Sequence, residues 1–118
     1  MTTPQEAAVD RLVEAYNAQD VEALAACFAE GAQIHRYPGV LLQDGREAIR
    51  ADYAKLFADA PENRNEVVQR IAVGAHVADQ SRLRRTPDAE PTDLLVIYTI
   101  ENKLVVRVDY LSAEAEAG

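Results

Sequence analysis

Three side chains stand out as candidates for acid–base or anion-binding chemistry: Arg36, Asp79 and Asp109. Arg36 shares a predicted strand face with Ile34, so its guanidinium could hold a carboxylate or an enolate. Asp79 and Asp109 lie on later predicted strands, where an interior carboxylate with a raised pKa could act as a general base. In the alternative interpretation, Arg36 forms a surface ion pair and Asp109 simply pairs with Arg107 on its own strand.

Metal and cofactor chemistry has little support in the sequence. The only histidines, His35 and His76, are too far apart for ligand spacing, and no cysteine or acid completes a set, so we expect no metal site. His35 is expected to be a structural histidine that faces away from Arg36. No glycine-rich dinucleotide motif, P-loop or serine-hydrolase elbow occurs, so no cofactor is expected.

The composition indicates one globular domain that does not bind polyanions. The chain has 118 residues, 48% of them apolar, and a net charge of 12 − 20 = −8. A negative protein has no electrostatic attraction for nucleic acid or anionic lipid, so neither is an expected partner. The single cysteine, Cys27, excludes an internal disulfide. With no basic leader at the N-terminus, we expect a cytoplasmic protein.

Helical periodicity fills most of the N-terminal half, in two segments before residue 31. Thr3 and Glu6 form a capping box ahead of an apolar stripe that ends near Tyr16. Asp20 is expected to cap a second, short helix, which Gly31 ends.

A strand over residues 32–37 should follow, before a third helix. This helix is expected to begin near Asp44, with Glu47 completing its cap, and to stop at Pro61.

From residue 65 onward the apolar period becomes two, which predicts strands. The expected strands are Asn65–Val73, His76–Arg85, Asp93–Glu101 and Leu104–Leu111. Asn102 and Lys103 are expected to form the tight turn of the last hairpin. Helices followed by a meander predict an α+β domain over residues 1–111, with 112–118 as a flexible tail.

The strand at residues 94–100 carries apolar residues on both faces. Tyr98 and its alternate neighbours point one way, whereas Leu95 and Ile97 point the other. The helices can cover one face, and a second copy of the chain would cover the other. Each exposed Leu or Val would forfeit about 1.5–3 kcal/mol of burial, so a homodimer through the sheet face is predicted.

Four segments carry a recognisable pattern: residues 16–24, 28–34 and 45–49 and the hairpin 98–111. Together they resemble the nuclear transport factor 2-like superfamily, which includes ketosteroid isomerases and SnoaL-like polyketide cyclases. The resemblance covers nearly the whole chain. It implies a cone-shaped barrel in which three N-terminal helices pack on a curved, mostly antiparallel sheet. It also implies a largely apolar pocket inside the cone and a homodimer.

The resemblance also allows a test of isomerase chemistry, residue by residue. The reaction needs a carboxylate base and two acidic donors to an oxyanion. The base position falls on Arg36, which stays protonated, and the two donor positions fall on Val96 and Leu12. Because none of the three residues suits its role, steroid isomerase activity of the known type is not expected.

Two functions stay open at this point. The first is a protein that binds a small apolar molecule with a carbonyl or carboxylate, with isomerase- or cyclase-like acid–base catalysis as one use of that site. The alternative is a non-catalytic dimeric interaction or ligand-binding module whose cone is filled by its own side chains. A cavity of about 300 Å³ or more with an Arg and an Asp converging on it would favour the first, and a closed interior would favour the alternative. The candidate lining residues are Tyr16, Ile34, Arg36, Tyr53, Phe57, Ile97 and Asp109.

Overall fold

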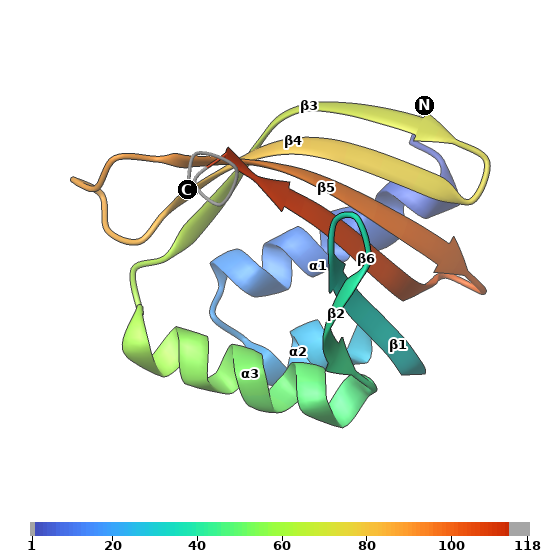
Figure 1. Ribbon diagram of the computed structural model, residues 1–118, viewed down its shortest axis with the longest axis horizontal. Helices are drawn as coiled ribbons and strands as arrows, with labels where there is room; N and C mark the ends of the chain where they lie inside the picture. The colour runs from blue at the N-terminus through green and yellow to red at the C-terminus, as the bar shows by residue number, and fades with distance from the viewer. Residues whose placement is uncertain (1, 114–118) are drawn as a thin grey trace.

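A computed structural model describes residues 2–113 as three helices and a six-stranded sheet (Figure 1). The helices are α1 (Pro4–Asn17), α2 (Val21–Ala26) and α3 (Arg46–Asp59). The strands are β1 (Phe28–Arg36), β2 (Val40–Asp44), β3 (Arg64–Val73), β4 (His76–Arg84), β5 (Thr92–Glu101) and β6 (Leu104–Ser112). None of these helices has the length and hydropathy needed to cross a membrane.

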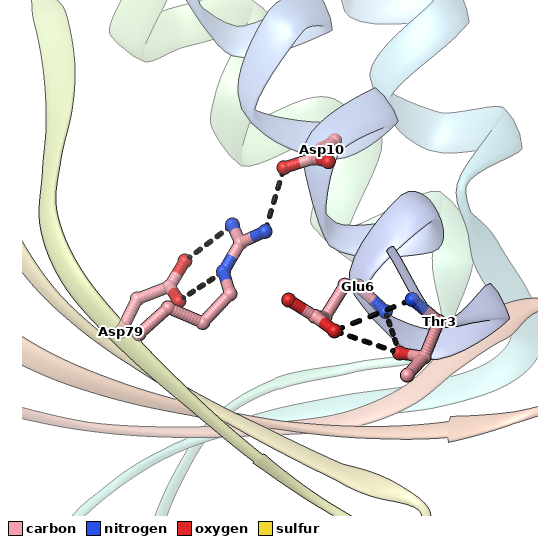
Figure 2. Close-up of polar contacts among 5 residues, drawn as sticks. Thr3, Glu6, Asp10 and Asp79 are labelled. Carbon is pink, nitrogen blue, oxygen red and sulfur yellow. Dashed lines mark hydrogen bonds and ion pairs between the residues drawn. The ribbon is translucent and has the colours of Figure 1, made fainter. Parts of the chain in front are cut away.

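The first two helices begin where the sequence predicts. At α1, the backbone N–H of Glu6 donates to Thr3 Oγ1 over 3.1 Å, and the Thr3 N–H donates to Glu6 Oε1 over 3.3 Å (Figure 2). At α2, the Asp20 carboxylate accepts from the N–H of Ala23 over 3.0 Å. These side-chain acceptors satisfy amide groups that have no partner inside the helix.

The predicted end of the second helix is wrong. α2 stops at Ala26, and Gly31 lies inside β1 instead of ending a helix. Phe28 begins the strand and is 1% exposed, because β1 pairs with β6 and places this ring in the core. The carbonyl of Cys27 accepts from the N–H of Val105 over 2.9 Å, so sheet pairing begins directly after the helix.

The third helix begins two residues after Asp44, and its predicted side-chain cap is wrong. Asp44 belongs to β2, a strand that the sequence analysis missed, and its carboxylate accepts from Gln33 Nε2 over 3.1 Å. Gly45 is the N-cap residue, with φ of 96° and no side-chain cap. Glycine tolerates this positive φ, so the chain turns sharply from β2 into α3.

The sheet has the strand order β2-β1-β6-β5-β4-β3. All neighbours pair antiparallel except β1 and β6, which pair parallel. The turn between β5 and β6 has positive φ at Asn102 and Lys103, as predicted. Ser112 is the last residue of β6, and residues 114–118 of the expected tail lie outside the described residues.

The three helices lie on one side of the sheet and form the core with its inner face (Figure 1). Val96, Tyr98 and Ile100 on β5 are buried there, as expected. On the outer face of the same strand, Leu95 is 42% exposed in this single chain. The fold is therefore the expected α+β arrangement, with a curved sheet that does not close.

Candidate functional site

An open cavity of about 770 Å³ lies between the helices and the inner face of the sheet. Its walls come from α1, α3, all six strands and the segments that join α3 to β3 and β4 to β5. The most buried lining side chains form its floor and the exposed ones form its rim. The floor consists of Leu12, Tyr16, Phe28, Ile34, Asn63, Val96, Tyr98 and Val108, each at most 6% exposed.

The floor is mostly apolar and is held by aromatic packing. The Tyr16 ring meets those of Tyr53 and Phe57 edge to face, with centroids 6.0 and 5.4 Å apart and interplanar angles of 83° in both cases. Such contacts add about 0.5–1.5 kcal/mol each beyond the burial of area. Phe57 does not itself line the cavity; it supports the two tyrosines that do.

The rim carries both signs of charge. Its cations are Arg36, Lys55 and Arg85, and its carboxylates are Asp52, Asp59 and Glu90. Asp52 accepts a hydrogen bond from Gln43 Nε2 over 2.7 Å. Within residues 2–113, no hydrogen bond or ion pair engages the side chain of Arg36. Its guanidinium is therefore available to an anion at the mouth of the cavity.

The tyrosines of the cavity are neutral hydrogen-bonding groups. Burial raises the pKa of Tyr16 to about 12, although the hydrogen bond from Asn63 and the charge of Arg85 act in the opposite direction. Burial also raises the pKa of Tyr53 and of Tyr98. All three hydroxyls keep their protons at neutral pH, so they can donate to an oxygen of a bound molecule.

Four of the predicted lining residues meet in this cavity: Tyr16, Ile34, Arg36 and Tyr53. Ile97 is not among the lining residues, because it alternates with Val96 and Tyr98 and lies on the outer face of β5.

Asp79 lies on the inner face of β4 but outside the cavity. It is fully buried and forms a bidentate ion pair with Arg70, whose Nε and Nη2 lie 2.7 and 3.0 Å from its carboxylate oxygens. Nη1 of Arg70 reaches Asp10 on α1 over 2.6 Å (Figure 2). The expectation that Asp79 points into the pocket is thus corrected: its carboxylate holds Arg70 of β3, and Arg70 in turn joins the sheet to Asp10 of α1.

Asp109 lies on the outer face of β6, away from the cavity. Arg107 donates to both of its oxygens, over 2.8 and 3.0 Å. This ion pair lowers the pKa of Asp109, whereas a general base in an apolar pocket needs a raised pKa. The geometry therefore favours the alternative, a satisfied ion pair on the sheet.

His35 lies beside Asp109 in the register and, as predicted, on the opposite face from Arg36. It is 7% exposed, and its Nδ1 has no hydrogen-bond partner within the described residues. Nowhere in residues 2–113 do three His, Cys, Asp or Glu side chains gather as metal ligands would.

Sequence analysis missed two floor residues that carry polar groups, Asn63 and Tyr98. The sequence does indicate that Tyr98 points inward, since it alternates with Val96 on the face predicted to point toward the helices. Asn63 lies in the segment between α3 and β3, where no periodicity indicates which side chains turn inward.

The three positions singled out by the resemblance all line the cavity. Leu12 and Val96 belong to its floor and Arg36 to its rim. The cavity therefore occupies the place where the resemblance puts an active site, but no carboxylate or other acidic donor stands at these positions.

The family model of the SnoaL-like domain matches residues 9–108 of this chain. Among solved structures, a cystatin-fold protein from Novosphingobium aromaticivorans is 28% identical, with a TM-score of 0.83 over 93% of this chain and 98% of that one. An NTF2-like protein from Cytophaga hutchinsonii is 14% identical, with a TM-score of 0.78 over 99% and 96% of the two chains.

A third similar structure is IdmH from Streptomyces antibioticus, described as a candidate polyketide cyclase. It is 21% identical, with a TM-score of 0.77 over 94% of this chain and 93% of that one. A comparison with curated proteins gave no match. The structural likenesses establish a shared fold.

Proposed function

The chain belongs to the family of SnoaL-like domains, and we propose that it binds a small apolar molecule carrying a carbonyl or carboxylate group. The observation that carries this proposal is the cavity of about 770 Å³ with an unpaired arginine, Arg36, at its rim. This volume lies in the range of about 300–1,000 Å³ that is typical of small-molecule sites.

The chemistry of the lining indicates which ligand would fit. Its aliphatic and aromatic floor offers burial worth about 25 cal/mol for each Å² of apolar ligand surface. Neutral tyrosine hydroxyls can donate to a carbonyl oxygen, and Arg36 can pair with a carboxylate. The alternative, an interaction module whose cone is filled by its own side chains, predicts no interior space of this size.

Catalysis in this cavity would need a different acid or base from the one used in ketosteroid isomerases. Asp79 and Asp109 each have both oxygens engaged by an arginine. The carboxylates that line the cavity are those of Asp52, Asp59 and Glu90, all on the exposed rim. We therefore propose ligand binding as the main function. An isomerase- or cyclase-like reaction would have to use one of these three rim carboxylates as its acid or base.

The test is a binding measurement with a matched pair of ligands. We expect dodecanoic acid and its uncharged analogue dodecanol both to raise the melting temperature of the protein and to bind in calorimetry. Arg36→Gln should lower the affinity for dodecanoic acid by about fivefold or more and leave the affinity for dodecanol unchanged, because only the acid pairs with the guanidinium. Arg11→Gln, which removes an equal charge from the exposed face of α1, should change neither.

The proposal fails if a panel of fatty acids, steroids and polyketides produces neither a rise in melting temperature nor heat of binding. If the two arginine variants lower the affinity for dodecanoic acid equally, the role given to Arg36 is wrong, because a general effect of net charge would then explain the loss.

We further propose that the protein is a homodimer through the outer face of the sheet. Ile71, Val73 and Leu95 expose 68%, 69% and 42% of their surface on that face. A second copy would remove these apolar side chains from water.

A cytoplasmic location is also proposed, which the single cysteine supports because it cannot form an internal disulfide.

A further inference from the structure

Tyr98 has a polar group at the floor of the cavity that the protein itself does not satisfy. Its side chain is 3% exposed and lines the cavity from β5, near the middle of the sheet. No hydrogen bond joins its hydroxyl to any group in residues 2–113. The hydroxyl oxygen also keeps some accessible surface. It therefore faces open space within the cavity.

The other tyrosines of the cavity differ from Tyr98 in this respect. The hydroxyl of Tyr16 accepts a hydrogen bond from Asn63 Nδ2 over 2.7 Å. Tyr53 and Tyr110 also lack hydroxyl partners, but both side chains are partly exposed and water can reach them. Tyr98 is thus the deeply buried tyrosine of this group whose hydroxyl depends on whatever fills the cavity.

A purely hydrocarbon ligand would leave the Tyr98 hydroxyl without a hydrogen-bond partner. A buried donor that loses water without gaining a partner weakens binding, whereas an oxygen acceptor on the ligand restores the hydrogen bond. The acceptor should be uncharged, because the floor offers it no free cation. The half-buried guanidinium of Arg70 is not free either, because it already binds Asp79 and Asp10 with three of its nitrogens.

We propose that Tyr98 is a specificity-determining residue that donates a hydrogen bond to a neutral carbonyl oxygen at the leading end of the ligand. This inference rests on the proposed function and narrows it to one class of ligand. The molecule is apolar in its middle, carries a carboxylate that stays at the rim with Arg36, and carries a ketone or similar carbonyl that enters first.

The experiment compares dodecanoic acid with its analogue that bears an oxo group on the penultimate carbon. We expect wild-type protein to bind the oxo acid about tenfold more tightly, which corresponds to about 1.4 kcal/mol. Tyr98→Phe should abolish this preference and leave the affinity for dodecanoic acid unchanged or improved. Tyr37→Phe, the same change at a side chain that is 57% exposed and outside the cavity, should keep the preference.

The outcomes separate the two proposals. Equal affinities of wild-type protein for the two acids overturn the role of Tyr98 while leaving the binding function intact, and so does a preference that survives in Tyr98→Phe. If neither acid binds, this inference falls, and the proposed function falls with it when the panel of fatty acids, steroids and polyketides also shows no binding. An unchanged melting temperature of unliganded Tyr98→Phe shows that the variant is folded, because the substitution removes only an oxygen without partners.

Discussion

Nδ2 of Asn63 donates a hydrogen bond over 2.7 Å to the hydroxyl oxygen of Tyr16, and both side chains are almost completely buried. The contact joins the segment after α3 to α1 across 47 residues of sequence. The backbone carbonyl of Asn63 also accepts from Gln19 Nε2 over 3.0 Å. This corner of the cavity is therefore positioned by polar contacts as well as by apolar packing.

The coupling between Tyr16 and Asn63 can be measured with a double-mutant cycle. Tyr16→Phe, Asn63→Leu and the double variant should give an interaction free energy of about 0.5–1.5 kcal/mol in urea unfolding, because each single change removes the same hydrogen bond. Strictly additive losses would show that the two groups do not stabilise each other.

The ion pair between Arg70 and Asp79 should be far more important for stability than those on the surface. Arg70→Met leaves the fully buried Asp79 carboxylate without its main partner, and we expect a loss of about 3–5 kcal/mol in the free energy of unfolding. The matched control is Arg82→Met, which breaks an exposed pair with Asp93 and should cost about 1 kcal/mol or less. Comparable losses in the two variants would contradict the structural role given to Asp79.

The stability of the protein should fall at alkaline pH. The folded-state pKa of Tyr16 is about 12, above the usual value of 10.0, so the unfolded chain releases its proton first as pH rises. The stabilisation of the folded state by this raised pKa is fully present below about pH 10 and is lost as pH approaches 12. For Tyr16 alone, the free energy of unfolding falls by about 1 kcal/mol near pH 11.

Urea unfolding at a series of pH values above 9 should therefore show a smaller decline for Tyr16→Phe than for wild-type protein. Tyr37→Phe should decline like wild type, because that side chain is largely exposed. An identical decline in Tyr16→Phe and wild type would mean that the Tyr16 hydroxyl titrates alike in the folded and unfolded states.

The outer face of the sheet should control the oligomeric state. We expect wild-type protein to sediment as a dimer at micromolar concentration, and Leu95→Lys to sediment as a monomer, because two lysines would be buried in the symmetric interface. A wild-type monomer would end the dimer proposal.

The sequence was sufficient for the features that depend on local chemistry and on periodicity. The capping box at Thr3, the cap at Asp20 and the turn at Asn102 and Lys103 each depend on residues close together in the chain. The four C-terminal strands follow from the alternation of apolar residues, which one inward face of a sheet imposes. The family resemblance then supplied the arrangement of these elements, and the structure confirms it.

Tertiary structure decided what the sequence pattern left open. Gly31 and Asp44 carry local signals for helix boundaries, yet Gly31 lies within β1, and Asp44 lies in β2, where it pairs with Gln33 of β1. The roles of the carboxylates were likewise fixed by distant partners: Arg70 engages Asp79, and the β6 register turns Asp109 outward. Whether a side chain faces a cavity, an ion pair or water depends on what the fold brings opposite it, and periodicity within one element cannot specify that neighbour.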